Sequence, residues 1–132
     1  CHWPGIYFNG QEHGFRVFQE AVLRLHRRYD HLVWMKLSEI ARYWAAKELT
    51  SITVRSGQIE LDAPFASPDF TVQVPILSRG DVKIVARGKT VTPRQVGKIS
   101  DLEPGTWHPE DRVATICFDL QKGRTEIQTQ GA

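Results

Sequence analysis

The chain has 132 residues, which is enough for one hydrophobic core or for two small domains. Hydrophobic residues make up 41% of it and charged residues 24%, as in ordinary globular proteins, and a formal net charge of +2 is too small to favour a nucleic-acid partner. No apolar stretch approaches the roughly 20 residues that cross a bilayer, so we expect no membrane span.

The first 49 residues predict a loop, a helix, a strand and a second helix, in that order. Apolar residues recur at steps of three and four from Phe15 to Tyr29, which is typical of an amphipathic helix. The largely apolar residues 32–37 predict a short buried strand, and Ser38 is a suitable N-cap for a helix that runs to Leu49. Such βα units need neighbouring strands, and the chain begins abruptly. We therefore expect residues 1–49 to be the end of a longer α/β domain.

From residue 50 onward apolar and polar residues alternate, which predicts β structure. Short strands separated by frequent turns are typical of an antiparallel β-sandwich-like module. The expected elements are a hairpin over 51–62, strands over 70–76 and 82–87, a loop over 102–111 and a last hairpin over 112–129. The predicted fold class is therefore α+β, with residues 1–49 forming one domain and residues 50–132 the other.

The cysteines and histidines give little support for a reactive or metal-binding site. Cys1 and Cys117 could pair in an oxidising compartment, but a terminal position and an apolar setting favour two free thiols. The histidines show no HxH or HxxxH spacing, so we expect no metal site within this chain. The first residues also lack a signal-peptide pattern, and the compartment stays unknown.

His2 is the strongest catalytic candidate, because it stands where a strand would end and a loop begin, the usual place for catalytic groups in α/β folds. Trp3 and Tyr7 follow it and could stack on a sugar ring. In the β half, Trp107 lies in a Pro- and Gly-rich loop and could form a second stacking platform. The alternatives are that His2 is an ordinary loop residue and that Trp107 covers the edge of a core.

Three parts of the sequence carry a resemblance to a known family: Cys1-His2-Trp3-Pro4-Gly5, the helix expected after it, and Trp34-Met35-Lys36-Leu37-Ser38-Glu39-Ile40-Ala41-Arg42-Tyr43-Trp44. Together they resemble the C-terminal end of a polysaccharide deacetylase-like (NodB homology) catalytic domain, which is a distorted (β/α) barrel. The resemblance spans about residues 1–48.

The resemblance implies that His2 is the late catalytic histidine, a general acid for the leaving amine, and that Tyr43 and Trp44 are core residues. The family's catalytic Asp and its Asp-His-His metal ligands lie earlier in the barrel and have no counterpart here. A divalent metal such as zinc is thus expected only in a full-length parent, and this chain alone should be inactive.

A second hypothesis makes the chain a non-catalytic α+β domain that binds carbohydrate or protein and is complete as it stands. The two hypotheses differ in how the large apolar side chains are covered. The deacetylase-like hypothesis expects that one copy of the chain cannot cover all of them, so that either the missing barrel or a homo-oligomer does. The residues in question are Phe15, Phe18, Trp34, Tyr43 and Trp44.

Overall fold

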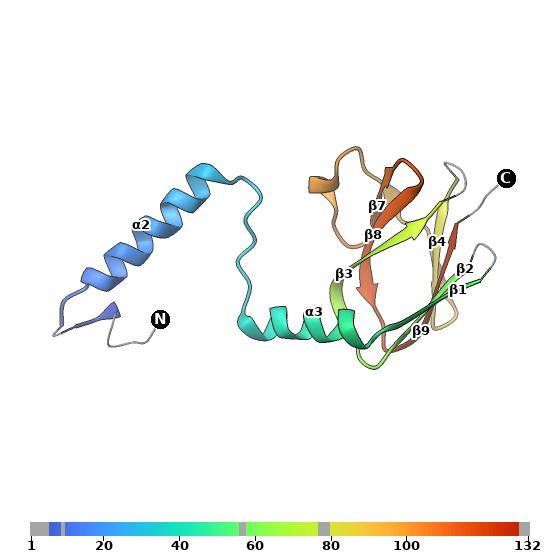
Figure 1. The fold of residues 1–132 in the computed structure, drawn as a ribbon, viewed down its shortest axis with the longest axis horizontal. Helices are drawn as coiled ribbons and strands as arrows, with labels where there is room; N and C mark the ends of the chain where they lie inside the picture. Colours follow the sequence, from blue (N-terminus) through green and yellow to red (C-terminus); the bar gives the residue numbers. More distant parts are fainter. Residues whose placement is uncertain (1–5, 9, 56–57, 77–79, 130–132) are drawn as a thin grey trace. The chain divides into compact units, whose positions relative to one another are not determined.

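The computed structural model describes residues 6–8, 10–55, 58–76 and 80–129, and it divides into two compact units, Cys1–Trp34 and Met35–Ala132. The first unit contains one long helix, and the second contains one helix and all of the strands (Figure 1). The elements are α2 (His13–Arg28), α3 (Leu37–Leu49), β1 (Ser51–Arg55), β2 (Gln58–Ala63), β3 (Ser67–Pro75), β4 (Val82–Ala86), β5 (Lys89–Val91), β6 (Arg94–Gln95), the short 3-10 helix η1 (Ile99–Asp101), β7 (Thr106–Glu110), β8 (Val113–Leu120) and β9 (Gly123–Thr129).

The strands of the second unit form two sheets. A five-stranded sheet has the order β1-β2-β9-β4-β5, and a four-stranded sheet has the order β3-β8-β7-β6. All neighbouring strands are antiparallel except β6 and β7, which are parallel. The predicted α+β class and the two mostly antiparallel sheets are thus confirmed. No helix within the described ranges is long and apolar enough to cross a membrane.

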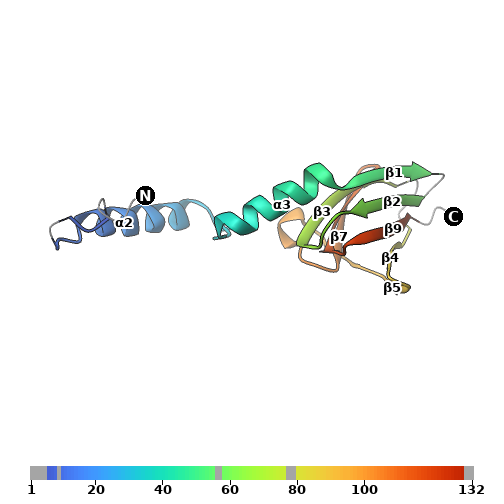
Figure 2. The same ribbon diagram turned by 90° about the horizontal axis from the view of Figure 1, so that it is seen from below.

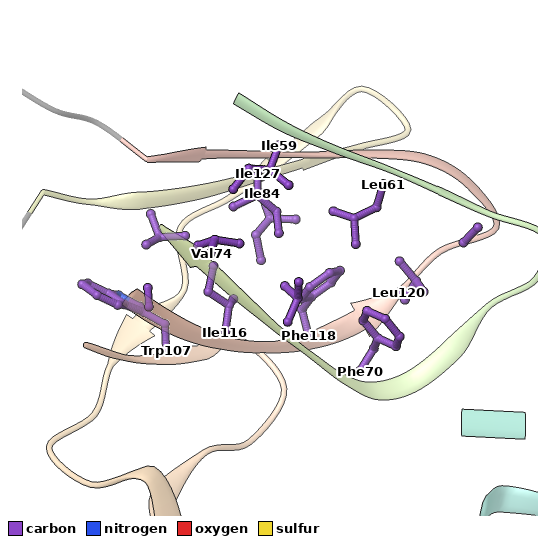
Figure 3. Packing of buried hydrophobic residues seen from close by; sticks show 14 of the residues in the cluster. Ile59, Leu61, Phe70, Val74, Ile84, Trp107, Ile116, Phe118, Leu120 and Ile127 are labelled. Atoms are coloured by element: carbon purple, nitrogen blue, oxygen red, sulfur yellow. The ribbon is translucent and has the colours of Figure 1, made fainter. Parts of the chain in front are cut away.

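One buried layer lies between the two sheets (Figure 3). Because successive strand residues point to opposite faces, every second side chain of the central strands enters this layer. Ile127 of β9 and Ile116 of β8 are fully buried and come from different sheets. Phe70 packs edge-to-face on Phe118 at a centroid distance of 6.1 Å. The second unit therefore has a core that joins both sheets.

Helix α3 belongs to the strand-containing unit. Ala46 is fully buried in the shared core, and the ring of Tyr43 lies 5.9 Å from that of Phe70. The Tyr43 hydroxyl also forms a 2.6 Å hydrogen bond with the Thr71 hydroxyl. The predicted domain boundary after residue 49 is therefore replaced by one between Trp34 and Met35, because α3 packs on β3.

The predicted helix over 15–29 is confirmed as α2, but its apolar side chains are poorly covered. Phe18 is 47% exposed, and none of the residues 13–28, all of which the structure describes, is buried. Arg24 on the polar side pairs with Glu20 at 2.8 Å, one helical turn earlier. The apolar periodicity therefore predicts the helix correctly, but in the structure no core covers its apolar side.

The predicted strand over residues 32–37 is wrong. Residues 31–36 are neither helix nor strand, and α3 begins at Leu37. The Trp34 indole N–H donates to Nε2 of His26 at 2.7 Å instead of facing a neighbouring strand. The predicted N-cap at Ser38 also shifts, because the Glu39 carboxylate accepts a 2.7 Å hydrogen bond from the backbone N–H of Lys36.

Two predictions for the C-terminal strands also need correction. The expected loop over 102–111 contains strand β7, which pairs with β8. The expected last hairpin does not form, because β8 pairs with β3 and β7 whereas β9 pairs with β2 and β4. The chain crosses from one sheet to the other at Gly123, whose φ of +90° suits glycine. Strands β8 and β9 therefore lie in different sheets although they follow each other in the chain.

The hairpin predicted over residues 51–62 is confirmed by the register of β1 and β2, in which Ile52 lies opposite Leu61 and Val54 opposite Ile59. Its expected turn at 56–57 lies outside the described residues. A second hairpin joins β4 to β5 through Arg87 and Gly88, with φ values of +50° and +74°. Positive φ at both central positions is the requirement of a type I′ turn.

Replacing Arg87 with asparagine should stabilise the protein. Arg87 is exposed and holds a left-handed conformation that costs about 1 kcal/mol for most residues, whereas asparagine tolerates it. We expect Arg87→Asn to raise the free energy of unfolding by about 0.5 kcal/mol in urea titrations. The control Gly88→Ala has room for its Cβ but not the right conformation, and should lower stability. Equal midpoints for the three proteins would contradict this account of the turn.

Candidate functional site

The predicted site residues do not gather in one described place. His2 and Trp3 lie outside the described residues, so their suggested roles remain predictions. Tyr7 is half-buried, and its ring stacks on that of Phe15 with a centroid distance of 5.8 Å and an interplanar angle of 20°. One face of the Tyr7 ring is therefore covered by Phe15 at the start of α2.

Trp107 does not form an exposed stacking platform. Its side chain is only 4% exposed and belongs to the core cluster, where it lies at the opposite end from Phe70 (Figure 3). The reason is its place in strand β7, opposite Ile116 of β8, whose side chain points into the same layer. Its predicted sugar-stacking role is therefore corrected, and the alternative of a core-edge residue fits its position.

The other face of the four-stranded sheet carries a set of polar side chains. The core residues of β3, β7 and β8 occupy alternate positions, so the residues between them point away from the core. The register places these residues in two rows across the three strands. We call this set the outer polar face; it consists of Thr71, Cys117 and Thr106 in one row and Gln73, Thr115 and His108 in the other.

The two residues that β7 contributes to the outer polar face, Thr106 and His108, form hydrogen bonds with the backbone. The Thr106 hydroxyl accepts from the backbone N–H of Glu103 at 2.9 Å and donates to its carbonyl at 2.8 Å. Nδ1 of His108 lies 3.1 Å from the carbonyl oxygen of Val96, and because a carbonyl only accepts, Nδ1 must carry the proton. Nε2, the other ring nitrogen of His108, is not used by this hydrogen bond.

Cys117 is a free thiol at the centre of this face, but it is not activated. Burial raises its pKa from 9.0 to about 11, and the negative charges of Asp69, Asp119 and Glu103 act in the same direction. Only the thiolate is a good nucleophile, so the environment is opposite to that of a reactive cysteine. Cys117 therefore has the character of a buried structural residue.

The outer polar face carries groups that can form hydrogen bonds. Thr71 and Gln73 are exposed, and the buried hydroxyl of Thr115 has no hydrogen-bond partner among the described residues. No group of three or more His, Cys, Asp or Glu residues in the described part of the chain could hold a metal ion. The described residues thus do not supply the ligands of the zinc site that a deacetylase needs.

Sequence reasoning missed the outer polar face. The alternation of Phe70, Val72 and Val74 was a usable signal, because it places Thr71 and Gln73 on the opposite side of β3. This alternation could not show that β8 and β7 would lie beside Thr71 and Gln73.

Cys117 should react slowly with a thiol reagent while the protein is folded. In a Cys1→Ser background at pH 8, we expect labelling by a disulfide reagent at least about tenfold slower than in urea, because the raised pKa removes thiolate. A raised pKa also means that this thiol stabilises the fold fully below pH 9 and that this contribution is lost as pH rises towards 11. Equal labelling rates for folded and unfolded protein would contradict this environment.

Comparisons with known proteins do not assign the chain to a family. No family model matches the sequence. The search of curated proteins found no significant match. The search of solved structures found none either.

Proposed function

We propose that this chain is the C-terminal part of a polysaccharide deacetylase-like protein. Its N-terminal residues would complete a catalytic barrel, and its strands would form an accessory module. The proposal rests on the sequence resemblance of residues 1–48 and on one structural observation, the second apolar stripe of α3.

Helix α3 has two apolar faces. Tyr43 and Ala46 face the sandwich, as described above. A second stripe, at helical spacing and rotated away from the first, consists of Leu37, Ile40 and Trp44. These three side chains are exposed, with Trp44 at 63%. Trp44 is therefore not a core residue within the described structure, and its implied core position stays a prediction for the longer protein.

Large exposed apolar side chains are normally covered by a partner, since burial is worth about 25 cal/mol per Å² of apolar surface. Helix α2 adds to this argument, because Phe18 and Leu25 on its apolar side are also exposed. Trp34 is 56% exposed as well. Such surfaces are expected of helices that pack on the remaining strands and helices of a larger domain.

In this proposal His2 donates a proton to the amine that leaves when an N-acetyl group is removed from a sugar. A histidine suits this role, because its ordinary pKa lies near neutral pH. The metal that activates water in the family would be held by residues outside this chain. The chain alone should not release acetate.

The accessory module would contact the carbohydrate chain through the outer polar face. Gln73 offers an exposed amide group, and Thr71, two residues earlier on β3, offers the remaining capacity of a hydroxyl that is already bonded to that of Tyr43, while the half-buried His108 lies two strands away. Such groups match the donors and acceptors of sugar hydroxyls. This carbohydrate contact is also the most specific form of the alternative hypothesis, a non-catalytic binding domain.

A deacetylase assay on the longer protein tests the proposal directly. The protein would carry these 132 residues together with the preceding catalytic residues, and acetate release from N-acetylglucosamine oligomers would be measured. We expect His2→Ala to lower kcat by about 100-fold or more, the usual loss for a general acid, and His108→Ala to leave kcat unchanged.

Two results would contradict the proposal: an inactive wild-type protein, or a His2→Ala variant that retains full activity. The Gln73→Ala variant tests separately whether the accessory module binds the substrate. If the outer polar face binds the substrate chain, this variant raises KM for long oligomers but not for a dimer of the sugar, and kcat stays the same.

A further inference from the structure

The four edge strands of the two sheets differ in how well they are protected against pairing with another strand. Strands β5 and β6 have only three and two residues. Strand β3 carries Pro68, Pro75 and a register shift between Ser67 and Phe70, and α3 packs on it. Short length, proline and bulges are the usual means by which proteins block their sheet edges. Three of the four edges are therefore protected.

Strand β1 lacks these protections. It has five residues, contains no proline, and pairs with β2 in an unbroken register. In Figure 2 it forms the outer edge of the five-stranded sheet, and no described strand lies on its other side. Its single charged residue is Arg55, at one end. An open edge of this kind presents unpaired backbone N–H and C=O groups.

Two side chains of β1 are apolar but uncovered. Ile52 lies opposite Leu61, and Val54 lies opposite Ile59, so both point to the face of the sheet that carries the core. Their partners on β2 are buried, yet Ile52 is 52% exposed and Val54 is 63% exposed. The core therefore extends as far as β2 but does not cover β1, the last strand of the sheet.

We propose that β1 pairs with β1 of a second copy of this chain, in antiparallel orientation about a two-fold axis at Thr53. In this register Ile52 lies opposite Val54 of the second copy, and Thr53 lies opposite Thr53. In an edge strand, every second residue directs its N–H and C=O groups away from the neighbouring strand of its own sheet. A two-fold axis centred on a residue places these free groups of one copy opposite those of the other copy. The five-stranded sheets of the two copies then form one continuous sheet.

The sequence of β1 supports a second copy as the occupant, because the strand is complementary to itself. The pairing places Arg55 opposite Ser51, so no like charges face each other. It also joins the exposed Ile52 and Val54 of each copy into one apolar cluster. A closed two-fold contact of this kind uses the same surface on both copies and leaves no free edge at β1.

Cross-linking through engineered cysteines tests this register in the full chain with Cys1→Ser as background. Residues directly opposite each other have Cα atoms about 4.5–5.5 Å apart, which is within the range of a disulfide. Thr53→Cys should therefore form a disulfide-linked dimer under mild oxidation. Ser51→Cys is the matched control, because the two copies of residue 51 would lie about 13 Å apart along the strands.

Sedimentation of the untreated chain provides the second readout. We expect the wild-type chain to be dimeric and Ile52→Lys to weaken the dimer at least tenfold, because a charge at an edge prevents strand pairing. Val91→Lys, at an equally exposed apolar position of β5, should leave the dimer intact.

A monomeric wild-type chain at about 100 μM, or equal cross-linking of the two cysteine variants, would overturn the proposal. An association through the apolar side of α2 would survive Ile52→Lys and would also overturn it. The proposed deacetylase-like function does not depend on the outcome, because its assay uses the longer protein and variants of other residues.

Discussion

The structure of the second unit depends on one buried layer shared by two sheets. Ile116 and Ile127 are close to each other in sequence, but β8 and β9 place them on opposite sides of this layer. Three of the pairings around the layer join strands far apart in the sequence, namely β2 with β9, β3 with β8 and β4 with β9. The core can therefore form only when both sheets assemble together.

The same layer determines which surfaces are available for function. It buries Trp107, which removes the most obvious aromatic platform, and it fixes the alternate residues of β3, β7 and β8 as the outer polar face. It also holds α3 through Ala46. What the layer does not cover is equally informative: the second stripe of α3 at Leu37, Ile40 and Trp44, and the edge of β1.

The parts of the fold that follow from local patterns could be predicted from the sequence. The steps of three and four between Phe15 and Tyr29 gave α2, and the alternation around residues 51–62 gave the first hairpin. The strand predicted over 32–37 failed because local apolar character does not show whether a neighbouring strand exists. Strand β7 was missed because its residue Pro109 and the nearby Pro104 and Gly105 resemble a loop, while its pairing with β8 is a long-range property of the fold.

The site was less predictable than the fold. Which residues form the outer polar face depends on strand order, and the outward direction of Cys117 appears only once β8 is flanked by β3 and β7. The role of His2 stays a prediction that rests on resemblance. Both gaps have one physical cause, since a single sequence records local periodicity but not which distant segments meet.

The sandwich and α3 share a core and stabilise each other, whereas α2 has an apolar side without a core of its own. Amide hydrogen exchange on the intact chain measures this difference directly. We expect amides of β8 and β9 to exchange at least about 100-fold more slowly than those of α2, because short helices without tertiary packing are marginal in water. Equal protection of residues 13–28 and of the central strands would contradict it.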